Sequence, residues 1–497
     1  MAEDFSPQQR RSTLTISIWE GVFAQFHGVL AGGSFVTCYV LAYNASNLQL
    51  ALLAAIPPFA LVIQLVSAHW LQYLHRRKPF TIITAGISRF SWLLIAFIPF
   101  LFPKTQALTL FFIVYAILNL LMAMAANSWL SWMADAIPAS LRGRYFSKRN
   151  MICTIVGFTG YGVAMLYDHI KDNQSDRVIN LFSPIVPEFM GPAQSIVFIL
   201  LGIIFVIAVL TGGLLNVIYL IKQPEPPFVK TEVKDANNQI TTIKMSLWAA
   251  FKNILKMKDF RTLCLVMIIW HIVNGFATPF WGPFRLRDLQ MSLTAVSICD
   301  NILGPLCTII SLFFWGKIID RFGNKTVILF TLYVTAFHPL FYVVSTPNFT
   351  ALIYLDAISS GLMWSGFGIA LLNLQLAFIP KHGREIYLAI YSAVVGVVFT
   401  IPMFIGGWVV DLVGERTFLS LQAIPIVLWL VCIGRFACLI WFTKINDPKE
   451  KPMVQLVMHL IMQVKEGFIG IPRFFMPKED YNTLDDTNDE SPTMPQH

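Results

Sequence analysis

A small set of titratable side chains lies inside long apolar stretches of the sequence, where a charge is costly to hold. A histidine and a carboxylate at similar depth in such a medium can exchange a proton near neutral pH. His271 and Asp300 lie on neighbouring apolar stretches, so we expect them to form a protonatable pair. A histidine can also simply hydrogen-bond a neighbouring helix. The set comprises Glu20, His27, Arg89, His271, Asp300, Asp356 and Arg435.

The stretches that hold these residues are long enough to cross a membrane. Hydrophobic residues make up 56% of the chain and charged residues 13%, with a mean hydropathy of +0.64. Soluble domains carry about twice that share of charge. The first stretch exceeds a signal-peptide core, so we expect it to remain as a span. The sequence predicts an all-α polytopic protein with twelve spans, at 16–41, 48–73, 79–102, 107–134, 147–167, 194–221, 262–284, 291–315, 326–346, 350–376, 387–411 and 419–443.

The distribution of basic residues predicts one orientation. With a cytoplasmic N-terminus, the inner segments hold 28 of the 36 Lys and Arg residues and the outer loops hold six. Short inner loops are enriched in Lys and Arg. We therefore expect both termini in the cytoplasm and a multi-pass protein of the plasma (inner) membrane. The net charge of +8 then needs no nucleic-acid partner.

The long connection at 222–261 divides the chain into two halves. The first half, 16–221, holds six predicted spans, and the second half, 262–443, holds the other six. Residues 131–150 and 374–392 both read as an apolar helix, a proline and a Gly-Arg pair, Gly143-Arg144 and Gly383-Arg384. Ile18-Trp19 and Ile269-Trp270 also correspond. The offset is about 240–250 residues throughout, which predicts parallel six-helix repeats.

A charged turn, GKIIDRFGNK (316–325), joins two of the second-half spans. Its counterpart after span 48–73 keeps Arg76, Arg77 and Lys78 but lacks both glycines and the Asp. The spacing Gly-x-x-x-Asp-Arg-x-Gly-x-Lys resembles the signature loop of the major facilitator superfamily, and the resemblance covers roughly residues 14–445. It does not select a subfamily.

The resemblance implies roles for residues at two depths. In that family the signature Asp and Arg lock the cytoplasmic ends of the halves, and the first, fourth, seventh and tenth spans line the cavity. The loop charges would also be explained if they only fix the orientation of the chain in the membrane. The asparagines would also be explained if they only form hydrogen bonds between helices. Arg89 and Arg435, on supporting spans, would form structural pairs or snorkel. The implied gate is Gly316, Asp320, Arg321, Gly323 and Lys325, with Asp135, Arg144 and Arg384 as partners. The implied cavity residues are Glu20, His27, Asn119, Asn127, His271, Asn274, Asp356, Trp364 and Asn373.

The remaining segments are expected outside the bilayer core. Residues 1–15 form a cytoplasmic N-terminal segment, and 222–261 a linker whose part 246–260 suits an interfacial helix. In the tail, 444–497, the apolar piece 454–464 is too short to span, so it either lies on the surface or packs under the bundle. Residues 479–497 are acidic and expected to be disordered. The seven cysteines fall within spans and lack metal-type spacing, so no metal or cofactor is expected.

The sequence contains no P-loop or nucleophile elbow, which argues against an ATP-driven pump or an enzyme. The resemblance implies a monomeric secondary active transporter that moves a small organic solute by alternating access, coupled to protons. Two alternatives stay open. One is a lipid or amphiphile translocator, or a drug exporter, of the same fold, suggested by 41 Phe and 13 Trp. The other is a non-transporting receptor or scaffold.

Overall fold

A computed structural model describes residues 6–74, 76–137, 142–187, 190–226, 232–234, 240–242, 247–379, 384–413 and 423–467. The chain divides into two compact units, Met1–Glu450 and Lys451–His497. In the second unit the apolar piece of the tail, 454–464, forms part of a helix, α22 (Met453–Gly467). The acidic end at 479–497 lies outside the described residues.

Helices build the first half of the larger unit. They are α1 (Pro7–Leu30), α2 (Gly33–Ala42), α3 (Asn47–Ala60), α4 (Ile63–Leu74), α5 (Arg77–Leu101), α6 (Lys104–Ala136), α7 (Arg142–Gly157), α8 (Thr159–Asn173), α9 (Ser175–Phe182), α10 (Pro192–Ile207), η1 (Ala208–Gly213) and α11 (Leu214–Lys222).

The second half follows a linker that contains a short antiparallel ribbon, β1 (Glu232–Lys234) and β2 (Ile240–Thr242), with Val233 opposite Thr241. The sequence had not indicated this ribbon. The helices are α12 (Leu247–Lys256), α13 (Lys258–Gly275), η2 (Thr278–Phe280), α14 (Trp281–Pro283), η3 (Phe284–Asp288), α15 (Leu293–Ser297), η4 (Ile298–Leu303), α16 (Gly304–Phe322), α17 (Asn324–Ala336), α18 (His338–Val344), α19 (Ala351–Phe378), α20 (Arg384–Val413) and α21 (Ala423–Phe442).

Ten helices in the described residues are long and apolar enough to cross a membrane, or eleven if the bent pair Lys258–Gly275 and Thr278–Asp288 counts as one span. The predicted helical membrane fold is confirmed at this level, and the count of twelve remains a prediction. The expected first span, 16–41, corresponds to α1 and α2. These two helices are separated by Ala31 and Gly32, and Gly33 has a φ of +50°, a conformation that glycine adopts without strain.

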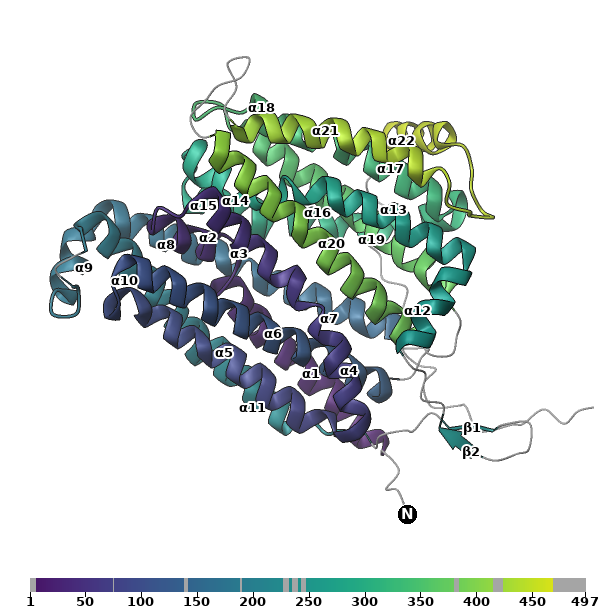
Figure 1. The fold of residues 1–497 in the computed structure, drawn as a ribbon, viewed down its shortest axis with the longest axis horizontal. Helices are drawn as coiled ribbons and strands as arrows, with labels where there is room; N and C mark the ends of the chain where they lie inside the picture. The colour runs from purple at the N-terminus through teal and green to yellow at the C-terminus, as the bar shows by residue number, and fades with distance from the viewer. Residues whose placement is uncertain are drawn as a thin grey trace, which may run out of the picture. The chain divides into compact units, whose positions relative to one another are not determined.

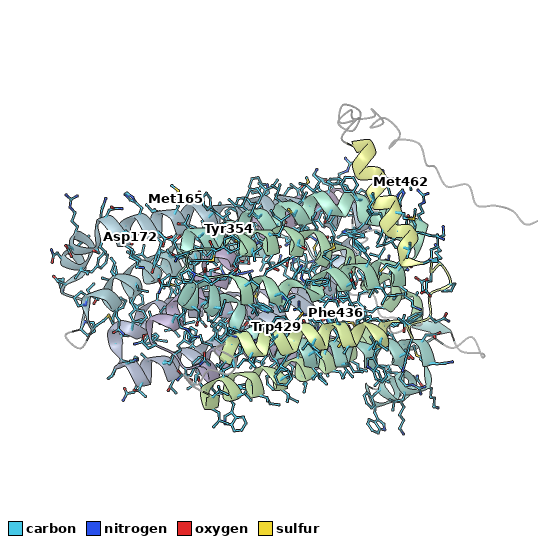
Figure 2. The ribbon with its side chains drawn as sticks, turned by 90° about the horizontal axis from the view of Figure 1, so that it is seen from above. Met165, Asp172, Tyr354, Trp429, Phe436 and Met462 are labelled. Atoms are coloured by element: carbon cyan, nitrogen blue, oxygen red, sulfur yellow. The ribbon has the colours of Figure 1, made fainter. Side chains whose placement is uncertain are left out.

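The outer faces of the helices carry large apolar side chains that the described residues of the unit leave exposed. Figure 2 shows two of them, Met165 on α8 and Trp429 on α21. Met165 is 54% exposed and Trp429 is 40% exposed. A soluble monomer rarely exposes such a surface. Such a surface is typical of a protein whose outer faces lie against lipid chains.

The two halves meet through a few helix pairs (Figure 1). Helix α3 of the first half lies against α20 of the second, and α8 and α2 contact α15. We call the end of the unit that holds the turn at 316–325 the loop end, and the other the far end. The segment just after α21 lies at the loop end, because Gly323 contacts Lys449 there.

Small residues allow α3 and α20 to approach closely. A Cβ atom on Gly407 would lie 2.5 Å from the Ala51 Cβ atom and 2.9 Å from the Asn47 carbonyl oxygen. A Cβ on Gly396 would likewise meet the Pro58 carbonyl oxygen. Small residues permit such close backbone contact between membrane helices. The contact between the halves thus depends on glycine along one face of α20.

Candidate functional site

A histidine and an aspartate contact each other in the second half. The His338 Nδ1 atom lies 3.1 Å from the Asp356 Oδ1 atom, and Tyr342 donates a hydrogen bond of 3.3 Å to Oδ2. Ser360 lies within 3.4 Å of Oδ1, and Ser359 Oγ is 3.0 Å from His338 Nε2. The side chains of His338 and Asp356 are 5% and 14% exposed. This is a largely buried histidine–carboxylate pair held by α18 and α19 together.

An ion pair lies in the same half. Arg285 of η3 donates to both carboxylate oxygens of Asp300 in η4, at 2.7 and 3.1 Å. Bidentate pairs of this kind are the strongest charge-assisted hydrogen bonds. Asp300 also accepts a hydrogen bond of 2.8 Å from Ser34 of α2, in the first half. The pair therefore joins the two halves. Trp281 stands beside Tyr342, with ring centroids 4.6 Å apart, and connects this pair to the His338 cluster.

The first half holds its own buried charges. Arg149 of α7 donates to the Glu20 carboxylate at 2.9 Å, and its guanidinium lies 4.4 Å from the centroid of the Trp129 ring. Asn216 of α11 donates to the same carboxylate at 2.8 Å and accepts from Arg89 Nε at 2.8 Å. Burial of these groups is tolerated because each has a partner. Glu20 is thus held by α7 and α11 together.

Both halves use a buried arginine and an asparagine to connect the same three spans. In the first half, Arg89 of α5 bonds Asn216 of α11, which bonds Glu20 of α1. In the second half, Arg435 of α21 donates from Nε to Asn274 of α13 at 2.8 Å and from Nη1 to the Thr335 carbonyl of α17 at 2.7 Å. The first, third and sixth spans of each half are joined in this way. These contacts favour the structural interpretation of the two arginines.

The structure does not form the predicted His271–Asp300 pair. Asp300 instead pairs with Arg285, the first residue after the predicted span 262–284. His271 Nδ1 lies 2.7 Å from the Met267 carbonyl of its own helix, and its ring meets Phe399 edge-on. The guanidinium of Arg285 forms a stronger ion pair and stronger hydrogen bonds with Asp300 than an imidazole ring would.

The other expected cavity residues are spread along the halves. Asn119 donates to the Tyr115 carbonyl one turn back, and Asn127 donates to Ser67 of α4 at 2.9 Å. Trp364 packs against Trp270. Asn373 donates to Asn324 at the loop end at 3.1 Å. His27 is buried, and its Nε2 atom has no hydrogen-bond partner among the described residues.

Three charged residues of these clusters were not selected from the sequence. His338 lies within the predicted span 326–346, so the rule that selected His271 applies to it equally. Arg285 was missed because the seventh span continues through η3 to Asp288, beyond the predicted end at 284. Arg149 lies within the predicted span 147–167 but was counted among the basic residues of the inner side. Helix α7 begins at Arg142 and carries Arg149 alongside Glu20.

Three of the expected gate residues contact their own half or the segment that follows α21, and not the opposite half. Asp135 pairs with Arg77 at 2.6 Å. The Lys325 N–H donates to Asp447 at 2.9 Å, and its ammonium lies 2.8 Å from Glu450. Gly323 has a φ of +89°, and a Cβ there would meet the Lys449 carbonyl oxygen at 2.7 Å.

The other residues of the expected gate are exposed, or their side chains lie outside the described residues. The structure places Gly316 in open space, and Arg321 stacks over Phe322. Asp320 is exposed and has no hydrogen bond or ion pair with the described residues. Arg144 and Arg384 lie in α7 and α20, but their side chains are outside the described part of the structure.

Loss of the Asn216 amide is expected to weaken the first half strongly. Asn216→Leu leaves Arg89 without its acceptor and removes a hydrogen bond from buried Glu20, so we expect a loss of about 2–4 kcal/mol in the free energy of unfolding. Thermal unfolding of the purified protein measures the effect. Asn119→Leu is the matched control, because Asn119 bonds only its own helix. Equal stability of the two variants would contradict this assignment.

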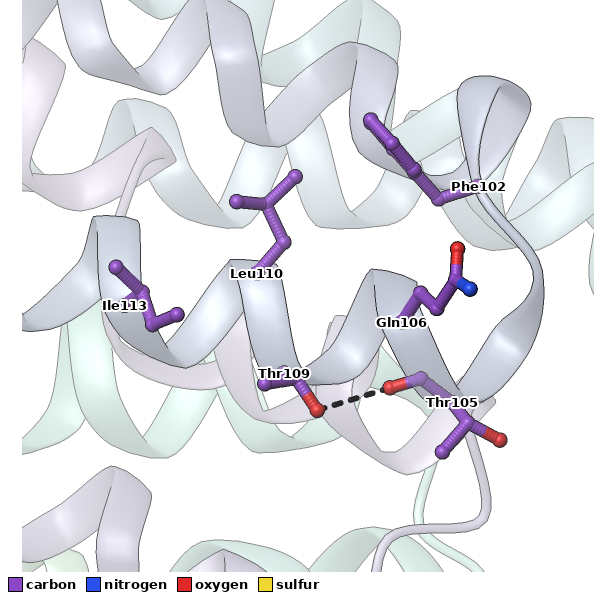
Figure 3. Close-up of a pocket in the computed structure, with 6 residues that line it drawn as sticks. All are labelled: Phe102, Thr105, Gln106, Thr109, Leu110 and Ile113. Atoms are coloured by element: carbon purple, nitrogen blue, oxygen red, sulfur yellow. Dashed lines mark hydrogen bonds between the residues drawn. The ribbon is translucent and has the colours of Figure 1, made fainter.

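A surface pocket of about 350 Å³ lies at the turn between α5 and α6 (Figure 3). Its lining is Phe102, Thr105, Gln106, Thr109, Leu110 and Ile113. The Thr109 hydroxyl already donates to the Thr105 carbonyl at 3.0 Å. None of the charged residues described above lines this pocket. Within the described residues, no group of three or more His, Cys, Asp or Glu could hold a metal ion.

The membrane-length apolar helices define a class, the polytopic helical membrane proteins. The sequence model of the Major Facilitator Superfamily matches residues 263–457. This match confirms, for the second half of the chain, the resemblance that the signature turn indicated, and no subfamily is distinguished. No curated protein sequence matches the chain.

Solved structures of transporters share the fold. A mutant form of the nucleoside transporter NupG is 12% identical with a TM-score of 0.60 and covers 87% of this chain and 99% of its own. A D-xylose-proton symporter is 16% identical with a TM-score of 0.59, covering 88% and 98%. A bacterial homologue of the human lysosomal transporter Spinster, in an inward-facing conformation, is 17% identical with a TM-score of 0.55, covering 88% and 95%. At these identities the likeness establishes the fold alone.

Proposed function

We propose that this protein is a secondary active transporter that moves a small polar organic solute across the membrane by alternating access, driven by protons. The observation that carries the proposal is the set of buried charges within two packed halves, because ionisable groups at membrane depth are costly and commonly serve the passage of a solute or an ion. The Arg285–Asp300 pair also reaches Ser34 in the other half. Movement of the halves must therefore change its surroundings.

The His338–Asp356 pair is the proton-coupling site of this proposal. Its two groups share one contact and are almost excluded from solvent, while Tyr342 and two serines supply hydrogen bonds. A proton added to this pair changes the charge within a packed cluster that also touches Trp281. Such a change can favour one arrangement of the helices over another.

The cargo of the proposal is a polar solute of nucleoside or sugar size. The solved structures that share the fold include proteins named for nucleoside and for D-xylose transport. The Arg285–Asp300 pair, whose carboxylate is 35% exposed, offers donors and acceptors to the hydroxyl groups of such a solute. These features support a polar solute over the lipid, amphiphile or drug alternatives.

In this proposal the protein is a monomer in the plasma membrane. The loop end of the larger unit faces the cytoplasm. Helix α12 then lies at the inner interface. Its residues Ala250 and Ile254 are buried, while Trp248 is 64% exposed. The Lys252 Nζ atom lies 5.3 Å from the centroid of the Trp248 ring. Exposed aromatic and lysine side chains together suit the headgroup region.

A binding screen tests the class of cargo. The purified protein is heated with nucleosides, D-xylose and other pentoses, and a lysophospholipid, because a ligand of the native state raises the apparent melting temperature. We expect a nucleoside or a pentose to stabilise the protein, with L-xylose as the matched control for D-xylose. Stabilisation by the lysophospholipid alone would contradict the proposal and favour an amphiphile translocator.

A further inference from the structure

Two aspartates at the far end each bind the start of a span in the opposite half. Asp411 of α20 accepts hydrogen bonds from the backbone N–H groups of Asn47 at 3.0 Å and Leu48 at 2.8 Å, the first residues of α3, and from the Asn47 side chain at 2.9 Å. Asp168 of α8 accepts from the backbone N–H and the hydroxyl of Thr294, both at 2.6 Å. Thr294 lies at the start of the span Leu293–Phe322.

These contacts are related by the internal duplication. Asp168 and Asp411 are 243 positions apart, and Asn47 and Thr294 are 247 positions apart. Both separations match the offset of about 240–250 between the halves. Helices α8 and α20 belong to the fifth spans, and α3 and α15 begin the second spans. The fifth span of each half therefore binds the second span of the other.

Among the described residues, each carboxylate accepts its hydrogen bonds from the opposite half only. Asp411 lies in the last turn of α20, which ends at Val413, and Asp168 lies near the end of α8 at Asn173. The negative end of a helix dipole disfavours a carboxylate, whereas free N–H groups at a helix start favour it. Separation of the far ends would leave Asp411 at an unfavourable helix end and would remove the carboxylate acceptors of three backbone N–H groups.

We propose that Asp168 and Asp411 are gating residues that form a symmetric latch at the far end. The latch stabilises the arrangement in which the far end is closed, and it must open in each transport cycle. The inference rests on the proposed alternating access. It assigns a gating role at the end of the molecule opposite the signature turn.

Hydrogen–deuterium exchange of the full-length protein in lipid nanodiscs tests the latch without any solute. We compare the wild type with Asp168→Asn, Asp411→Asn, the double variant and the control Asp172→Asn. Asp172 lies one turn further along α8 (Figure 2), is exposed, and makes no hydrogen bond or ion pair with the described residues. Thr294→Val, which removes only one hydrogen bond to Asp168, is a milder variant that keeps the test valid if the double variant unfolds.

The expected result is a reciprocal change at the two ends. Exchange should rise several-fold across the far-end segments 33–60 and 278–303 and fall across the loop-end segment 316–325, most in the double variant and least in Thr294→Val. A rise confined to the amides near Asn47, Leu48 and Thr294, with the loop end unchanged, would show a local cap and overturn the latch. An equal response in Asp172→Asn would also overturn it. The reciprocal change in a protein that transports no solute would refute the proposed function but not the latch.

Discussion

Asp356→Asn is expected to abolish proton-driven accumulation of solute while leaving solute exchange intact. The asparagine keeps the size of the side chain and its hydrogen bond with Tyr342, but it can neither bind a proton nor carry a charge beside His338. Uptake into proteoliposomes driven by a pH gradient should fall to the level measured without a gradient. His338→Gln should act in the same way, because coupling needs both members of the pair.

The matched control for this prediction is His271→Ala. His271 contacts its own helix and Phe399 and has no carboxylate partner in the described residues, so its removal should preserve coupling. Asp300→Asn should instead act on stability, because it breaks the ion pair with buried Arg285. Gradient-driven accumulation at the wild-type level by Asp356→Asn would contradict the assignment of the coupling site. Loss of coupling in His271→Ala alone would restore the pair predicted from the sequence.

Gly407→Leu is expected to prevent closure of the far end. The new side chain would overlap Ala51 and the Asn47 carbonyl, where α20 meets α3. Overpacking of this kind costs about 1–3 kcal/mol, which corresponds to roughly 5–150-fold in an equilibrium between two arrangements. Because we expect only the far-closed arrangement to contain this contact, the cost falls on that state. Solute exchange across the membrane should therefore slow by about one to two orders of magnitude.

The control is Gly368→Leu, since a Cβ on Gly368 has no atom within 4 Å. Thermal unfolding of both variants separates a gating defect from a folding defect. An exchange rate unchanged in Gly407→Leu, in a protein that melts like the wild type, would show that the contact between α3 and α20 does not control the cycle. Equal slowing in Gly368→Leu would mean that the effect is not specific to the contact.

The helical membrane fold could be predicted from the sequence because apolar length and basic-residue asymmetry are local properties. The signature turn indicated the family for the same reason, since a few residues at fixed spacing carry it. The count of spans was harder, because Glu20 and His27 make the first span more polar than its neighbours and Gly33 interrupts it. The packing of α1 and α2 against the other helices, rather than apolar length, supports this stretch as a span.

The partners of the buried charges could not be predicted, because they depend on which helix faces turn toward one another. The sequence offered four titratable groups of the second half, His271, Asp300, Asp356 and Arg435, and the one pairing inferred from it was wrong. The structure pairs Asp300 with an arginine and Asp356 with His338. The aspartates of the latch, 168 and 411, lie at span ends where acidic residues are ordinary. Only the contact across the halves distinguishes them.

Counterflow in proteoliposomes tests the central claim, that the two halves carry a solute across the membrane. Vesicles that hold the purified protein are loaded with the unlabelled solute found to stabilise it and are diluted into a trace of the same solute with a radioactive label. We predict a transient accumulation of label inside the vesicles, absent from protein-free vesicles and strongly reduced with Gly407→Leu. A solute that stabilises the protein but gives no counterflow in any orientation would contradict the account and would favour a receptor that keeps the fold without transport.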